Sequence, residues 1–473
     1  MKALNAVRFG DRELLPLVEG GKGISVTNHR SSGAWARTGG IGTVSAVNAD
    51  SYDDEGRPIP QVYRARTRLG RHEELIAYAI EGAVQQIRRA FDIARDELLA
   101  GRGALNINIL WEMGGAQRVL EAVLERTRGL VNGVTCGAGM PYRLAEIAAR
   151  YGVFYYPIVS SARAFRALWK RAYARFAEWL GAVVYEDPWV AGGHNGLSNA
   201  EDPRQPQDPY PRVRELRQVM REAGLPDSLP IVMAGGVWYL REWEHWIDNP
   251  ELGTIAFQFG TRPLLTQESP IPDAWKRKLT ELKEGDILLH RFSPTGFWSS
   301  AVRNSFLTEL EARAERQIAF STEAAGDHQY ELDVGVPRGK QRCYVTRDDL
   351  WRARTWAAQG FTEALRTPDN TLIFVTPEQR DAIRRDQADC MGCLSHCQFS
   401  SWKDHDDHTT GRPADPRSFC IQKTLQAIAH GGDPDRNLMF AGHSAFRFAT
   451  DPFYSNGFIP TVRQLIDRIL TGD

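Results

Sequence analysis

The sequence predicts an α/β fold, a parallel (β/α)8 TIM-type barrel followed by a mainly helical extension. Short apolar runs alternate with helical patterns over residues 15–260, and near-continuous apolar runs are typical of strands buried on both faces. Eight strand–helix units in about 250 residues is also the usual size of such a barrel. An open doubly wound sheet is the alternative, because periodicity does not show whether a sheet closes.

The predicted strands are short apolar segments that end in glycine or polar residues. They span residues 15–21, 40–45, 104–110, 133–139, 153–160, 182–187, 230–236 and 254–260. The helical patterns between them lie at residues 31–37, 73–99, 116–128, 142–151, 162–180, 213–223 and 240–247. The first strand–helix turn, Gly20 to Ser25, lacks the G-x-G-x-x-G spacing of dinucleotide-binding sheets, which favours the barrel.

The alternation stops after Gly260, which divides the chain into two regions. We expect the barrel over residues 1–265 and a mainly helical extension with its own site over residues 266–473. The predicted helices of the extension are residues 273–284, 305–318 and 347–365, whereas residues 324–342 are polar and expected to be irregular.

Composition excludes several classes of function. The 473 residues are 42% hydrophobic and 25% charged, with 58 Lys and Arg against 59 Asp and Glu, so the net charge is -1. A nearly neutral chain offers no electrostatic surface for nucleic acid or an anionic membrane. No apolar run reaches the length of a membrane span, and residues 1–10 lack the apolar core of a signal peptide. We therefore expect a cytoplasmic protein, of open oligomeric state.

The sixth predicted strand ends in Glu186 and Asp187 and leads into Gly192-Gly193-His194. Barrel active sites lie at the carboxyl ends of the strands, so this loop is the first candidate. A glycine pair lets backbone N–H groups approach an anion closely, and a histidine beside it is able to donate or accept a proton. The alternative is a tight turn with a solvated histidine.

Glycine-containing turns also follow the seventh and eighth predicted strands, at Gly235-Gly236 and Gly260-Thr261. Loops at these two places commonly form the phosphate site of a barrel, and a threonine hydroxyl beside a backbone nest suits a phosphate monoester. No P-loop lysine follows these glycines, which argues against a nucleoside triphosphate. The alternative is that the glycines serve only to form turns.

Together these motifs resemble a known flavoprotein family. The segments Ala191–Gly196, Ala234–Val237 and Gln258–Arg262 are similar to the FMN-binding segments of the nitronate monooxygenase (2-nitropropane dioxygenase-like) family. Residues 39–42 resemble its early glycine segment, and Asn108 matches an asparagine near the flavin. The resemblance covers about the first 300 residues and, with all its motifs present, is quite specific.

The resemblance implies an FMN-dependent enzyme in which His194 serves catalysis. This family includes nitronate oxidases, NAD(P)H-dependent flavin reductases and flavin-dependent enoyl-acyl-carrier-protein reductases. The candidates for cofactor binding are Gly20, Gly21, Asn108, Asp187, Gly192, Gly193, Gly235, Gly236, Gln258, Phe259, Gly260 and Thr261.

Two departures from the family pattern bear on the reaction. In nitronate monooxygenases the proposed base follows the fifth strand, but the corresponding residues 159–165 contain no histidine. Lys22 stands in the first loop, where the family often has methionine. Lys22 either meets an anionic substrate or is a solvated loop residue.

A cysteine motif in the extension predicts a metal centre. Cys390, Cys393 and Cys397 have the spacing C-x2-C-x3-C, and Cys420 follows. Four thiolates suit zinc or an iron–sulfur cluster, and three close cysteines with a distant fourth favour a [4Fe–4S] cluster. Histidines between residues 396 and 408 leave a mixed zinc site open, and unrelated cysteines are the remaining alternative.

We therefore expect an FMN-dependent oxidoreductase that moves electrons or hydride between NAD(P)H, or another donor, and a small or carrier-bound organic substrate. One alternative is a nitronate monooxygenase proper that uses O2. Another, from a different class, is a non-redox barrel that binds a phosphate-bearing ligand and holds structural zinc. Substrate and donor stay open at this point.

Overall fold

A closed parallel barrel of eight strands forms the centre of the protein, which confirms the predicted TIM-type fold. The structure is a computed structural model that describes residues 1–336, 339–405 and 407–473. The last barrel strand pairs with the first, which closes the sheet. The barrel strands are β3 (Leu17–Glu19), β4 (Ile41–Ser45), β5 (Ala104–Leu110), β6 (Gly133–Gly137), β7 (Phe154–Val159), β8 (Val183–Glu186), β10 (Ile231–Ala234) and β11 (Ile255–Phe259).

Helices cover the outside of the barrel and bury its largest hydrophobic cluster. The barrel helices are α1 (His29–Ala36), α2 (Arg68–Ile93), α3 (Arg95–Leu99), α4 (Ala116–Arg126), α5 (Leu144–Tyr151), α6 (Ala162–Arg171), α7 (Pro209–Glu222) and the 3-10 helices η1 (Tyr173–Trp179), η2 (Leu240–Trp246) and η3 (Arg262–Leu264). A hairpin of β1 (Val7–Phe9) and β2 (Arg12–Leu14) packs against the side chains inside the barrel. Its position leaves the opposite end, where the strands terminate, for the site.

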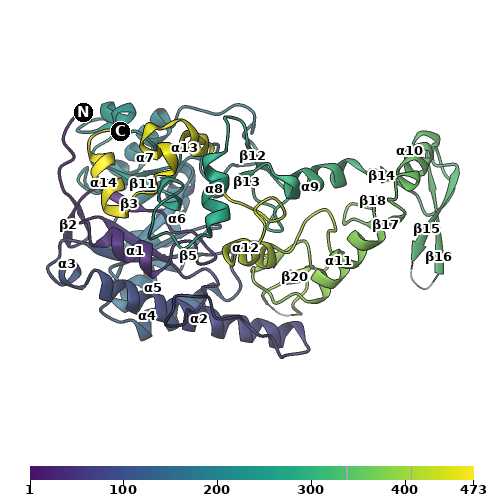
Figure 1. The fold of residues 1–473 in the computed structure, drawn as a ribbon, viewed down its shortest axis with the longest axis horizontal. Helices are drawn as coiled ribbons and strands as arrows, with labels where there is room; N and C mark the ends of the chain where they lie inside the picture. Colours follow the sequence, from purple (N-terminus) through teal and green to yellow (C-terminus); the bar gives the residue numbers. More distant parts are fainter. Residues whose placement is uncertain (337–338, 406) are drawn as a thin grey trace.

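The last helix of the chain, α14 (Val462–Leu470), packs with the barrel. Figure 1 shows α14 beside α1, and its apolar residues Leu465 and Ile466 belong to the barrel's hydrophobic cluster. The chain end also contacts η2, because Arg241 N–H donates to Gly472 O over 2.9 Å. Residues between η3 and α14 therefore form an insertion between the eighth barrel strand and a helix that completes the helical ring.

The insertion is a mixture of helices and short strands. Its elements are α8 (Asp273–Thr280), β12 (Ile287–His290), β13 (Ser299–Val302), α9 (Ser305–Glu315), β14 (Gln317–Ala319), β15 (Tyr330–Val336), β16 (Gly339–Val345), α10 (Arg347–Ala358), β17 (Glu363–Arg366), β18 (Thr371–Val375), α11 (Pro377–Ala388), β19 (His396–Cys397), β20 (Trp402–Lys403), α12 (Ile421–Ala429), η4 (His443–Phe446), α13 (Arg447–Thr450) and η5 (Pro452–Gly457). Figure 1 shows it extending away from the barrel, with β15, β16 and α10 at its far end.

Two predictions within the insertion require correction. Residues 324–342 were expected to be irregular, yet β15 and β16 form an antiparallel hairpin there; residues 337 and 338 lie outside the described residues. Tyr330, Leu332 and Val334 alternate with Glu331 and Asp333 along β15, and this period of two is a strand pattern despite its charge. The helix predicted over residues 347–365 ends at Ala358, and the chain then enters β17.

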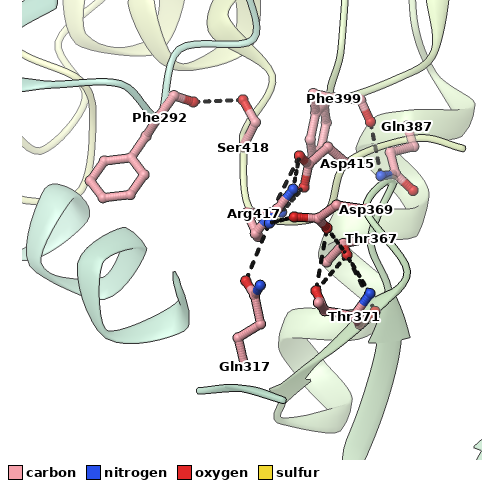
Figure 2. Close-up of polar contacts among 10 residues, drawn as sticks. All are labelled: Phe292, Gln317, Thr367, Asp369, Thr371, Gln387, Phe399, Asp415, Arg417 and Ser418. Carbon is pink, nitrogen blue, oxygen red and sulfur yellow. Dashed lines mark hydrogen bonds and ion pairs between the residues drawn. The ribbon is translucent and has the colours of Figure 1, made fainter. Parts of the chain in front are cut away.

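A polar cluster fastens the loop before Cys420 to the strands of the insertion (Figure 2). Arg417 bonds Asp415 within its own loop, and its Nη1 also lies 2.9 Å from Asp369 Oδ2. Because Asp369 sits in the turn between β17 and β18, the guanidinium ties two distant segments together. Ser418 Oγ donates to Phe292 O over 2.7 Å, which extends the connection toward β12.

In the part of the chain that the structure describes, no helix is both long and apolar enough to cross a bilayer.

Candidate functional site

A cavity of about 220 Å³ lies at the carboxyl ends of the barrel strands, where barrel active sites occur. The insertion contributes part of its wall through residues near Cys393, Gln422 and Phe440. The predicted site residues that line it are Gly20, Gly21, Asn108, Gly192, Gly193, His194, Gly235, Gly236, Gln258, Gly260 and Thr261. The fold thus gathers residues from the ends of five different strands around one space.

The glycine loops after β8, β10 and β11 form one side of the cavity. Gly235 and Gly236 have φ values of +94° and +77°, a region that side chains with a Cβ rarely adopt. A Cβ on Gly192 would lie 2.6 Å from Gly442 N, so the two loops touch through their backbones. A Cβ on Gly260 would meet nothing within 4 Å, which leaves open space next to the Thr261 hydroxyl. This arrangement offers backbone donors and room for an anion.

Two carboxamides also line the cavity. Asn108, at the end of β5, is 3% exposed, and the backbone of Gly21 passes so close that a Cβ there would lie 2.2 Å from its side chain. A Cβ on Gly20 would likewise lie 3.1 Å from Gln258 Nε2. Glycine at these two positions therefore lets the first loop pass beside the carboxamides, which keep their donors and acceptors available for a ligand.

Two predicted cofactor ligands have other roles in this structure. Asp187 is buried, and its Oδ1 accepts hydrogen bonds from the N–H groups of Trp189 (2.9 Å) and Val190 (3.2 Å). It therefore shapes the turn that leads to the Gly192 loop. Phe259 points into the barrel's hydrophobic cluster beside Trp35, because its neighbours Gln258 and Gly260 take the cavity face of the strand.

His194 faces the cavity from β9 (Gly193–His194), a short strand that pairs with β13 of the insertion. Its Nε2 lies 2.6 Å from Ser293 Oγ, and its ring meets the ring of Phe440 edge-on at 5.4 Å. Burial lowers the pKa of His194 to about 4, so the imidazole is neutral near pH 7. A neutral imidazole has one N–H donor and one acceptor nitrogen, as proton transfer to or from a ligand requires.

Two ionisable side chains also line the cavity. Burial, together with the nearby Asp187, raises the pKa of Glu186 to about 8, so its carboxyl is protonated near pH 7. Burial lowers the pKa of Lys22 to about 8, although Glu19 opposes this shift. Lys22 Nζ donates to Gly20 O over 2.7 Å, so this lysine is part of the cavity wall and is not a solvated loop residue.

Several residues of the site come from the insertion and were not predicted. Phe440, Gly442 and Ser444 line the cavity, and Gly442 N–H donates to Thr261 Oγ1 over 2.9 Å. Ser293 reaches His194 from the loop after β12. The one available sequence signal was the short Ala-Gly-His segment at residues 441–443, which repeats part of the Ala-Gly-Gly-His motif.

The four predicted metal ligands lie together in the insertion but do not form a recognisable metal site. Cys390, Cys393 and Cys397 are buried in one hydrophobic cluster against which Cys420 packs, and Cys393 also lines the cavity. Within residues 1–336, 339–405 and 407–473, no group of three or more His, Cys, Asp or Glu side chains is arranged to hold a metal ion. The predicted iron–sulfur cluster or zinc ion therefore has no support in this geometry.

The surroundings of the thiols favour their neutral form in this structure. Ser400 Oγ donates to Cys390 Sγ over 3.1 Å. Burial raises the pKa of Cys397 to about 11 and that of Cys420 to about 12. Thiolates, which ligate metals, are therefore disfavoured here unless a cation is bound to them.

Comparison with known proteins identifies relatives of this fold. A family model described as "Nitronate monooxygenase" matches residues 13–470. The structure of FabK from Thermotoga maritima is similar at a TM-score of 0.52 and 16% identity, over 97% of this chain and 92% of that chain. The enoyl reductase domain of MlnA, from the macrolactin biosynthesis cluster of Bacillus amyloliquefaciens, is similar at a TM-score of 0.53 and 11% identity, over 97% and 93%. No curated protein gives a significant match. At these identities the two structures establish a shared fold.

Proposed function

Because the chain belongs to the nitronate monooxygenase family and is an oxidoreductase, we propose that it binds FMN in the cavity at the carboxyl ends of the barrel strands. The observation that carries this proposal is the glycine-lined wall of that cavity. Gly192, Gly235 and Gly260 bring backbone groups from three strand ends to one place, and Gly260 leaves open space there. A phosphate monoester suits this nest, with the Thr261 hydroxyl beside it.

The carboxamides that line the cavity suit the ring system of a flavin. Asn108 and Gln258 present carboxamide groups to the cavity, and such groups match the donors and acceptors along a flavin edge. Lys22 adds a positive charge to the lining. When bound, FMN would accept or pass on electrons singly or as hydride. The residues that line the cavity would hold the cofactor and transfer protons to and from the substrate.

His194 is the residue that we assign to proton transfer. Its cavity position, its neutral form and its fixed ring suit a group that donates a proton to a substrate as electrons arrive, or removes one in the reverse direction. Phe440 and Val47 keep the surrounding wall apolar, and a drier cavity strengthens the electrostatic interactions inside it.

We favour reduction of a small or carrier-bound organic substrate, with NAD(P)H as donor, over nitronate oxidation. The segment after β7 offers Ser160 and Ser161 where nitronate monooxygenases are thought to place their base. Both hydroxyls are already engaged, since Ser160 Oγ donates to Gly196 O over 2.7 Å and Ser161 caps α6. The fold shared with an enoyl reductase domain makes an α,β-unsaturated thioester the first substrate to try.

Turnover by the FMN-loaded protein tests this proposal. We expect oxidation of NADH or NADPH, without oxygen, that depends on an added short enoyl thioester. Replacing His194 with Ala should leave FMN bound and lower kcat by roughly a hundredfold, the usual size of a general acid contribution. If the protein instead reacts with an alkyl nitronate and O2 and not with the thioester, the alternative that it is a nitronate monooxygenase is favoured.

The non-redox alternative makes opposite predictions for the same preparation. A barrel that binds a phosphate ligand and structural zinc would take up no FMN and would contain one zinc per chain. Elemental analysis also answers whether the cysteines hold iron. A Cys393→Ser variant with unchanged metal content would remove the four cysteines as ligands.

A further inference from the structure

A chain of hydroxyl groups connects His194 with the outside of the protein. His194 Nε2 lies 2.6 Å from Ser293 Oγ, which lies 2.9 Å from Thr295 Oγ1. Ser293 is 2% exposed, whereas Thr295 is partly exposed to solvent. Each hydroxyl carries one proton and two lone pairs, so every link is able to donate or to accept.

The insertion holds this chain in place through the residue before Ser293. Phe292 N–H donates to His290 Nδ1 over 3.2 Å, and Phe292 O accepts from Ser418 Oγ over 2.7 Å (Figure 2). The backbone of Ser293 is fixed as well, because Gly296 N–H donates to Ser293 O over 3.0 Å. These hydrogen bonds hold the backbone before and at Ser293 in place, and with it the position of the serine side chain relative to His194.

The groups around His194 favour a neutral ring that exchanges protons at both nitrogens. His290 packs nearby and is itself buried, which with His194 lowers its pKa to about 3, so it adds no charge near pH 7. Across the described residues, His194 Nδ1 has no protein hydrogen-bond partner, and it is left for a ligand in the cavity. Nε2 is committed to Ser293.

We propose that Ser293 and Thr295 form a relay that passes protons between His194 and solvent. This proposal rests on the proposed function, in which His194 exchanges a proton with the substrate. Ser293 and Thr295 would be positioning residues, because they act through His194 and do not touch the substrate.

The relay step conserves every proton. The His194 Nδ1–H bond breaks and the proton joins the substrate carbon, while the Ser293 proton moves to His194 Nε2. Ser293 then takes the proton of Thr295, and Thr295 takes one from a solvent water. The imidazole stays neutral and changes tautomer, which avoids an imidazolium in a buried position. After product release, a water that enters the open cavity gives a proton to Nδ1, while the Nε2 proton returns along the hydroxyls to the hydroxide left beside Thr295. The hydroxide formed in the cavity leaves to solvent, so one hydroxide is released for each proton that the substrate gains.

Single substitutions in the relay test its kinetic role. We expect Ser293→Ala and Thr295→Val each to lower kcat by roughly ten- to a hundredfold with KM and FMN content unchanged. Ser293→Thr and Thr295→Ser keep the hydroxyls and should restore most of the rate. Ser300→Ala is the matched control, because Ser300 also bonds a histidine, His443 (3.2 Å), from the same sheet of the insertion.

Nitrogen-15 NMR of the histidine rings supplies a measurement that needs no turnover. We expect His194 to be neutral at pH 7 with Nε2 hydrogen-bonded, and Ser293→Ala to change its two nitrogen shifts while Ser300→Ala leaves them unchanged. The signals are assigned by their loss in His194→Ala.

The two measurements separate failure of the relay from failure of the proposed function. Unchanged His194 shifts in Ser293→Ala, or kcat within twofold of the native rate in both Ser293→Ala and Thr295→Val, would overturn the relay. A protein without turnover on any substrate would count against the proposed function, and the NMR result would then decide on the relay alone.

Discussion

At the scale of single residues, the site combines groups that burial keeps neutral with one buried lysine. His194 loses its charge and Glu186 keeps its proton, both because the cavity wall excludes water. An anionic cofactor suits such a cavity, since Lys22 is the cation that faces it among the described lining residues. The cavity therefore becomes less favourable for an anion when Glu186 ionises.

Glu186 gives the site a predictable dependence on pH. Its folded-state pKa is raised to about 8, so the carboxylate forms as pH rises through 8 and repels the FMN phosphate. We expect the Kd for FMN to rise roughly tenfold between pH 7 and pH 9, which corresponds to about 1.4 kcal/mol of repulsion. Glu186→Gln should bind FMN normally at pH 7 and show a smaller rise, as measured by quenching of flavin fluorescence. Part of the rise should remain, because burial lowers the pKa of Lys22 to about 8 and this lysine loses its charge over the same range. The exposed Glu222→Gln serves as control, and a rise of the same size in Glu186→Gln as in the native protein would assign the effect to another group.

The sequence predicted which residue types lie at the ends of the barrel strands. It did not predict which residues from distant segments contact them. The glycine loops after β8, β10 and β11 were predicted because glycine pairs after apolar runs indicate turns at strand ends. Ser293 and Phe440 were missed because they lie about 100 and 250 residues from His194 along the chain. Only the tertiary fold brings them to it. The side-chain direction of Phe259 follows from strand alternation, which a motif match ignores.

At the scale of elements, the barrel strands were predicted better than the β15–β16 hairpin and the position of helix α14. All eight barrel strands lie within or next to the predicted ranges, because parallel strands buried on both faces leave continuous apolar runs. The β15–β16 hairpin was missed since charged residues interrupt its alternation. Helix α14 is amphipathic in sequence, yet amphipathicity shows only that one face is buried and not against which element.

The docking of α14 on the barrel makes a quantitative prediction. Ile466 is fully buried in the barrel cluster, whereas Leu470 on the same helix is 37% exposed. We expect Ile466→Ala to lower the free energy of unfolding by about 2–5 kcal/mol, and Leu470→Ala by less than about 1 kcal/mol. Urea denaturation followed by far-UV circular dichroism measures both. Equal effects would mean that α14 does not complete the barrel.

At the scale of the whole molecule, the insertion both covers the barrel mouth and completes the site. It follows the eighth strand, adds β13 to β9, and supplies the wall around Phe440. His194, the proposed proton-transfer residue, thus sits between the barrel and the insertion. The sequence placed the boundary after residue 265 from the end of the alternation, but it did not indicate that the chain returns to the barrel through α14.

Equilibrium binding of FMN tests the central claim most directly. Protein purified without oxygen and stripped of any flavin is titrated with FMN, and the visible spectrum and flavin fluorescence are followed. We predict one FMN per chain in the native protein. Gly260→Ala should weaken binding at least tenfold with an unchanged Tm of the flavin-free protein, because the added methyl meets no protein atom within 4 Å and enters the proposed phosphate space. A native protein that takes up no FMN, or a Gly260→Ala variant that binds it equally well, would contradict the proposed site.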